Sequence, residues 1–116
     1  MAKPPSAPDL RHRVAFDARA AVSDAYGNEV AGDFAEQFQT RADFRHRGGS
    51  EAVIAARLEG RNVLGVYVRS SSQTRAIQPG WRMRDARLGT VYAIDMVDGV
   101  TDPAWVYLTV ESGSAA

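Results

Sequence analysis

Apolar and polar residues alternate along most of the chain, and a period of two is typical of half-buried β-strands. The alternation is clearest at Leu64, Val66 and Val68, which would share one face of a strand. Tyr67 and Arg69 would then lie on the opposite face, because successive side chains of a strand point to opposite sides. The pattern predicts a mainly β protein.

Similar alternation occurs in five other segments, each bounded by turn-forming residues. The predicted strands contain Arg13 to Arg19, the second half of Phe34 to Arg47, Trp81 to Arg84, Val91 to Val97 and Trp105 to Glu111. Their buried faces are predicted to carry Val14, Phe16, Ala18, Tyr92, Ile94, Met96, Val106, Leu108 and Val110. Asp17 falls on the polar face of the first of these strands. About six short strands separated by turns favour a small antiparallel β-barrel or sandwich.

The chain between residues 47 and 61 interrupts this pattern. Gly48 and Gly49 break the preceding strand, good helix formers follow, and Gly60 ends the segment. Ser50 suits the N-cap of a short helix, but a helix of this length is marginal on its own. We therefore expect a flexible loop or a short helix between the early strands.

The length of 116 residues predicts one domain with a single modest core. We expect a flexible N-terminal arm at residues 1–9, a single β-barrel domain at residues 10–111 and a C-terminal tail at residues 112–116. The chain has no cysteine, which excludes disulfides and thiolate metal sites. We expect no membrane association, because no apolar stretch is long enough for a membrane span and the N-terminus lacks the apolar core of a signal peptide.

The sequence offers no pattern typical of catalysis, cofactor binding or metal binding. His12 and His46 each lie between two arginines, which disfavours a role as general base or metal ligand. No glycine-rich phosphate loop, nucleophile elbow or paired-histidine motif is present. We expect neither an enzyme nor a bound cofactor.

Charge leaves two interpretations open. Fourteen basic residues balance fourteen acidic ones, and thirteen of the cations are arginine, which favours bidentate pairing with carboxylates or phosphates. The candidate inter-subunit or DNA-facing residues are Arg41, Arg45, Arg47, Arg82 and Arg84.

Aromatic residues available for base stacking are Tyr67, Trp81, Tyr92 and Trp105. A small barrel that binds nucleic acid is therefore an alternative, although Asp43 interrupts the first arginine series and the zero net charge leaves little counterion release. Core packing accounts for Trp81 and Trp105 at least as well as base stacking does.

Eight short segments, in their order and spacing, carry a resemblance to a known family. They are Leu10 to Val14, Asp24 to Gly27, Arg41 to Phe44, Gly49 to Glu51, Val66 to Arg69, Ile77 to Met83, Val91 to Ile94 and Leu108 to Glu111. In this series the chain resembles the phage head-tail joining family, the head-closure or stopper proteins of siphophage connectors and phage-like gene transfer agents. The segment from Asp85 to Thr90 departs from it, because it is slightly longer than the expected tight hairpin.

The resemblance implies a compact β-barrel that forms a homo-oligomeric ring between the portal and adaptor on one side and the tail on the other. Such a ring belongs to the head-tail junction of a virion or phage-like particle made in the bacterial cytoplasm. It closes the DNA channel until the tail binds, and an early loop projects into the channel. The matching assembly loop here contains Gly48, Gly49, Glu51, Val53, Ile54, Arg57, Leu58 and Gly60. Its small apolar residues would pack on neighbouring subunits in such a ring, or else the loop would form a short helix that caps the barrel.

The channel role limits what the arginines do. Double-stranded DNA that passes through a ring should meet weak contacts at most, because each neutralised phosphate adds to the affinity. We therefore expect Arg41, Arg45, Arg82 and Arg84 to pair with acidic residues across subunit boundaries. Asp33, Glu36 and Asp85 are the candidate partners. A neighbouring connector role as adaptor or tail terminator is a further alternative, although the predicted scarcity of helix argues against an adaptor.

Overall fold

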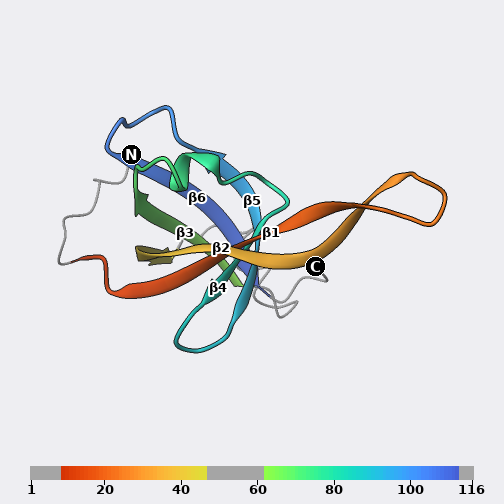
Figure 1. The fold of residues 1–116 in the computed structure, drawn as a ribbon. Helices are drawn as coiled ribbons and strands as arrows, with labels where there is room; N and C mark the ends of the chain where they lie inside the picture. Colours follow the sequence, from red (N-terminus) through yellow and green to blue (C-terminus); the bar gives the residue numbers. More distant parts are fainter. Residues whose placement is uncertain (1–8, 47–61, 113–116) are drawn as a thin grey trace.

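The computed structural model describes residues 9–46 and 62–112, and six β-strands account for most of them. The elements are β1 (His12–Ser23), β2 (Glu29–His46), β3 (Asn62–Arg69), the short 3-10 helix η2 (Thr74–Ala76), β4 (Arg82–Asp85), β5 (Val91–Asp98) and β6 (Trp105–Ser112). Every strand pairing is antiparallel, and the order β1-β2-β3-β6-β5-β4 closes into a barrel (Figure 1). The predicted mainly β architecture is confirmed.

The strand register places the connections at two ends of the barrel. The start of β1, the β4–β5 turn, the end of β2, the start of β3 and the end of β6 share one end, which we call the N-terminal end. Val14 pairs there with Asp85, and Asn62 with Ser112. The β1–β2 hairpin, the β3–β4 connection and the β5–β6 turn lie at the opposite, hairpin end.

The core fills the barrel with aliphatic and aromatic side chains from all six strands. Its members are Val14, Phe16, Phe38, Ala42, Leu64, Val66, Val68, Ile77, Met83, Tyr92, Ile94, Val106, Leu108 and Val110. Each large side chain removed from water here contributes roughly 1.5–3 kcal/mol to folding. The alternation predicted for β3 and β6 is therefore confirmed, and both strands present their aliphatic faces to this core.

The predicted burial of Met96 is wrong, because β5 contains a bulge. Ile94 pairs with Val110 and Met96 with Thr109, so one extra residue lies between the two pairs. The extra residue reverses the side-chain alternation beyond it. Met96 is 43% exposed, and Val97 packs against the core instead.

The first two strands also differ from the prediction. Asp17, expected on the polar face, is buried, and the register shifts between Phe16 and Asp17. Ala18, expected in the core, is only half-buried because it lies where β1 leaves the barrel. The strand expected in the second half of residues 34–47 is longer and covers Glu29–His46.

Residues 47–61 lie outside the described part of the chain. The expectation of a loop or a short helix there therefore stays a prediction. Among residues 9–46 and 62–112, no helix has the length and apolar character needed to cross a bilayer.

Candidate assembly surfaces

Three adjacent strands build a charged cluster on the outer wall of the barrel. Asp17 on β1 accepts hydrogen bonds from Arg84 Nε at 2.7 Å, Arg84 Nη2 at 3.0 Å and Arg82 Nε at 2.6 Å. Arg84 Nη2 also donates to Glu36 Oε1 on β2 at 2.8 Å. We call these four residues the carboxylate–arginine cluster. It ties β4, β1 and β2 together where the barrel closes.

The two arginines determine the protonation of this cluster. Burial alone would raise the pKa of Asp17, but the hydrogen bonds and positive charges of Arg84 and Arg82 outweigh it and hold that pKa below its ordinary value. The Asp17 hydrogen bond in turn raises the pKa of Arg84, with a smaller contribution from Glu36. Asp17 therefore stays ionised although its side chain is only 1% exposed.

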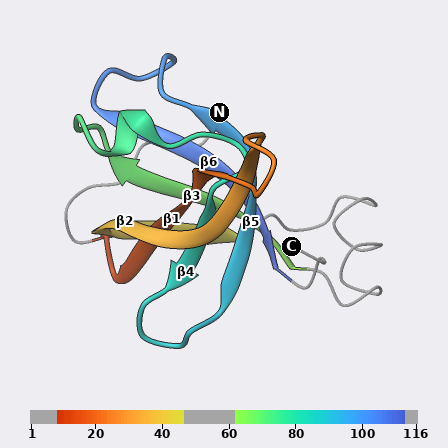
Figure 2. The same ribbon diagram turned by 45° about the vertical axis from the view of Figure 1, so that its right-hand side comes forward.

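The strands β1 and β2 extend beyond the barrel as a two-stranded hairpin. β4 pairs with β1 only between Val14 and Asp17, and β3 pairs with β2 only from Ala42 onward. Residues 18–35, which we call the hairpin arm, therefore pair only with each other. Figure 1 shows the arm projecting from the barrel, and in Figure 2 the molecule is turned so that the arm comes toward the viewer.

The base of the hairpin arm is braced by one aromatic ring. Two guanidinium groups lie over the Phe34 ring, with Arg19 Cζ 4.3 Å and Arg82 Cζ 4.5 Å from its centroid. Cation–π contacts of this kind contribute about 0.5–1 kcal/mol each at exposed sites. Because Arg82 also binds Asp17, the brace couples the direction of the arm to the carboxylate–arginine cluster.

The tip of the arm presents apolar side chains to solvent. Tyr26 is 91% exposed, Val22 45% and Val30 43%. The turn itself is well ordered by Asp24, whose Oδ1 accepts backbone N–H groups of Tyr26 and Asn28 at 2.8 and 2.9 Å. A hydrogen-bonded turn with an exposed tyrosine, flanked by exposed valines on the two strands that it joins, is typical of a contact surface.

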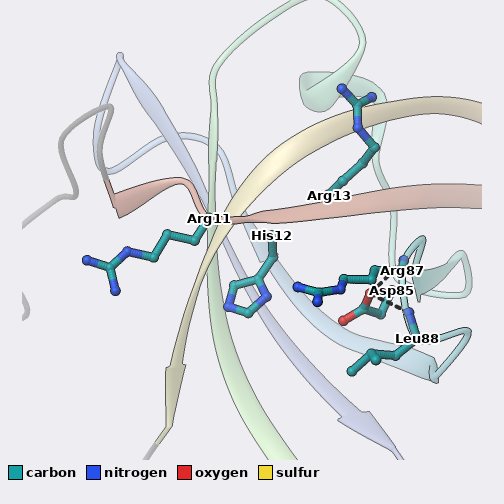
Figure 3. A pocket seen from close by; sticks show the side chains of 6 residues that line it. All are labelled: Arg11, His12, Arg13, Asp85, Arg87 and Leu88. Carbon is teal, nitrogen blue, oxygen red and sulfur yellow. Dashed lines mark hydrogen bonds between the residues drawn. The ribbon is translucent and has the colours of Figure 1, made fainter.

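A recess of about 490 Å³ lies at the N-terminal end of the barrel. It is lined by Arg11, His12, Arg13, Asp85, Arg87 and Leu88 (Figure 3). Figure 3 shows the Arg87 side chain directed toward His12, with Leu88 beside it and Arg13 directed away on the other side of β1. Asp85 Oδ1 accepts the backbone N–H groups of Arg87 and Leu88 at 2.9 and 3.0 Å, which fixes the turn that carries both side chains.

Four arginines surround this recess and the adjoining wall. Arg13 pairs across the strands with Arg41, so two like charges lie directly opposite each other. Together with Arg11 and Arg87 they form what we call the arginine rim. All four side chains are exposed, and within the described part of the chain none of them forms an ion pair.

The predicted arginine candidates lie in different places in the structure and have different partners. Arg82 and Arg84 meet in the carboxylate–arginine cluster, where Arg84 binds Glu36 of the same chain. Arg45 pairs with Asp43 at 2.9 Å and lies over the Tyr67 ring at 4.8 Å. Arg41 belongs to the arginine rim instead. Arg47 lies outside the described residues, as do the assembly-loop residues Gly48, Gly49, Glu51, Val53, Ile54, Arg57, Leu58 and Gly60.

The aromatic residues considered for base stacking are largely engaged with other side chains. Tyr92 belongs to the core, and Trp81 packs against it. On the outer wall, Tyr67 contacts Trp105 edge-on with ring centroids 6.5 Å apart, and Arg69 lies 5.4 Å from the Trp105 centroid. The Trp105 side chain therefore lies on the outer wall and not in the core.

The chemistry of these surfaces is that of charge pairing and apolar contact. Among residues 9–46 and 62–112, no group of three or more His, Asp or Glu side chains has a metal-binding arrangement. His12 stacks on Phe44 with ring centroids 4.0 Å apart. Sequence reasoning missed both the hairpin arm and the burial of Asp17, although exposed valines flanking an Asp-containing turn mark the arm.

Comparison with known proteins identifies a family and two similar solved structures. A family model described as phage head completion protein matches residues 5–113. The solution structure of protein SF1141 from Shigella flexneri 2a is similar with a TM-score of 0.68 at 14% identity, over 97% of this chain and 100% of that chain. A chain in the virion of a native gene transfer agent particle is similar with a TM-score of 0.60 at 15% identity, over 92% of this chain and 97% of that chain. At these identities the two structures show a shared fold, and no curated protein matches the chain.

Proposed function

The chain belongs to the phage head completion protein family, and from this premise we propose that it is a head-closure subunit that forms a ring at the head-tail junction. Family membership makes it a structural protein of a phage or phage-like particle. In the proposed role, the ring lies between the portal with its adaptor and the tail, and it retains packaged DNA until the tail binds. The role is structural, with no catalytic step.

The observation that carries this proposal is the family match over nearly the whole chain. The closed barrel with its projecting arm supports it, because a compact barrel supplies the wall of a ring while an arm reaches a neighbour. The similarity to a chain of a gene transfer agent virion agrees with a place in such a particle. A nucleic-acid-binding barrel is less favoured, because Tyr92 and Trp81 are engaged with the core.

The family resemblance further suggests that residues 47–61 act as the channel loop, and this is part of the proposal. The strand ends suit a direct test, because His46 and Leu64 are register partners on adjacent strands. Removing residues 49–59 leaves four residues, Arg47, Gly48, Gly60 and Arg61, to join β2 to β3. A connection of that length is common between antiparallel neighbours.

The experiment compares particles made with the full chain, with the shortened chain and without the chain. We expect the chain-free preparation to give heads that lose DNA and carry no tails. The shortened chain should still fold, as judged by circular dichroism, and should join tails while retaining less DNA. A same-length Gly/Ser replacement of residues 49–59 is the matched control for spacing. Fully tailed, DNA-filled particles in the absence of the chain would contradict the proposed function.

A further inference from the structure

The two ends of β1 carry surfaces of opposite charge. The hairpin arm lies at one end of the strand and the arginine rim at the other. β1 has 12 residues, and an extended strand of that length spans roughly 35–40 Å. The two surfaces therefore lie too far apart to meet within one chain.

We propose that the hairpin arm of one copy docks on the arginine rim and recess of the next copy, and that this contact is the repeating interface of the ring. The inference rests on the proposed function for the ring itself and goes beyond it by naming the interface. The occupant of the rim is thus a second copy of this chain.

Charge complementarity is the first argument. The arm carries three carboxylates, Asp24, Glu29 and Asp33, against one cation, Arg19, whose guanidinium lies over the Phe34 ring. Glu29 and Asp33 make no ion pair within the described part of the chain. Arg13 and Arg41 repel each other across the β1–β2 pairing unless an anion lies between or beside them. A neighbouring arm supplies such anions, which raises the association rate and selects the orientation of the contact.

Apolar contact is the second argument. The arm tip exposes Tyr26, Val22 and Val30, and the recess exposes Leu88 at 74%. Tyrosine is among the residues most enriched at the energetic centres of protein interfaces, where a ring fills a pocket and a polar rim excludes water. The recess beside Leu88, surrounded by arginines, has this composition.

Geometry is the third argument. Each copy has the hairpin arm at one end of β1 and the arginine rim that receives an arm at the other end. Copies would therefore associate head to tail, and such contacts close into rings when the rotation between copies permits. The Phe34 brace restrains the base of the arm before docking, which reduces the conformational entropy lost on binding.

DNA is the competing occupant of the arginine rim. Phosphates would satisfy Arg13, Arg41 and Arg87 equally well, but DNA leaves the exposed Tyr26 and the acidic arm without a partner. A second copy accounts for both surfaces at once, and the structure therefore favours it.

The test uses site-specific cross-linking in purified particles. The chain has no cysteine, so Ala25→Cys, in the same turn as Tyr26, and Ala86→Cys, in the same turn as Leu88, introduce the only thiols and keep both contact side chains. We expect the double variant, treated with a short bismaleimide, to give a ladder of cross-linked oligomers. Two single variants co-assembled in one particle should give dimers only. The matched control pairs Ala25→Cys with Val100→Cys, a 92% exposed position at the hairpin end of the barrel, and should give no ladder.

Charge reversal supplies the second measurement. Glu29→Lys with Asp33→Lys should reduce the ladder severalfold, and adding Arg13→Glu with Arg87→Glu should restore it. Particles that hold the double-cysteine chain at the junction yet give only monomer would overturn the proposal. It would also be overturned if the arginine reversal weakened binding of double-stranded DNA by the purified chain and left the ladder intact. Immunogold labelling separates the two claims, because absence from the head-tail junction contradicts the proposed function, whereas presence without cross-links contradicts only the interface.

Discussion

Asp17 and Arg84 form a bidentate ion pair across the β1–β4 pairing, with Arg84 Nε and Nη2 at 2.7 and 3.0 Å from the two carboxylate oxygens. The two residues are 67 positions apart in the sequence, and their contact lies where the barrel closes. Arg82 adds a third hydrogen bond, so a buried carboxylate is fully compensated. The charged cluster therefore holds β4, β1 and β2 together on the outer wall, while the apolar core holds the strands together inside the barrel.

The first prediction concerns the charge of Asp17. Asp17→Asn should lower the free energy of unfolding by about 1–3 kcal/mol, because the amide N–H₂ group faces guanidinium donors and the buried site loses its anion. Urea unfolding followed by circular dichroism measures this change. Glu36→Gln is the control, because its half-exposed carboxylate should contribute less than about 1 kcal/mol. Equal losses of unfolding free energy in the two variants would show that the burial of Asp17 does not increase the contribution of its carboxylate to stability.

The second prediction concerns the free energy of unfolding at low pH. Because the folded pKa of Asp17 lies below its unfolded value of about 3.9, the unfolded state binds the proton first as the pH falls. The contribution of Asp17 is therefore fully present above about pH 5 and is lost as the pH falls below about 4. Unfolding free energies of the natural chain and Asp17→Asn should converge as the pH falls below the unfolded pKa and through the lower folded pKa of Asp17. A constant difference between them at all pH values would contradict this assignment.

The third prediction separates two neighbouring residues of β5. Val97 packs against the core while Met96 faces solvent, because the bulge reverses the alternation. Val97→Ala should cost about 1–2 kcal/mol, whereas Met96→Ser should change stability by less than about 0.5 kcal/mol. Thermal or urea unfolding of the two variants decides between the bulged strand and a regular one, which would give the reverse order.

These variants also mark how far the sequence predicts the fold. The aliphatic faces of β3 and β6 follow a strict period of two, so Leu64 and Leu108 are assigned correctly to the core. The period-two pattern of the sequence cannot reveal a bulge, because a bulge arises from how a residue pairs with the neighbouring strand and not from the type of its side chain. For the same reason Met96 is assigned to the wrong face.

The candidate surfaces are less predictable than the core. Asp17 has the composition of an exposed strand residue, and its burial depends on Arg82 and Arg84, which lie 65 and 67 positions later. The length of the hairpin arm depends on where β3 and β4 stop pairing with β2 and β1, and no local pattern encodes that point. Long-range pairing therefore determines both surfaces.

The fourth prediction concerns the brace of the hairpin arm. Phe34→Ala removes the ring that holds Arg19 and Arg82, so the arm should open locally more often while the barrel stays folded. Amide hydrogen exchange should accelerate at residues 20–32 and remain unchanged in β3 and β6. Phe34→Tyr, which keeps the ring, should exchange like the natural chain. Uniform acceleration throughout the barrel would show that Phe34 supports the whole fold instead of the arm.

An electron cryomicroscopy reconstruction of the intact head-tail junction would show whether this chain forms the head-closure ring. We expect a ring of barrels between the portal complex and the tail, each fitted by residues 9–46 and 62–112 with the arm reaching the adjacent copy. A junction whose density holds no copy of this barrel would contradict it.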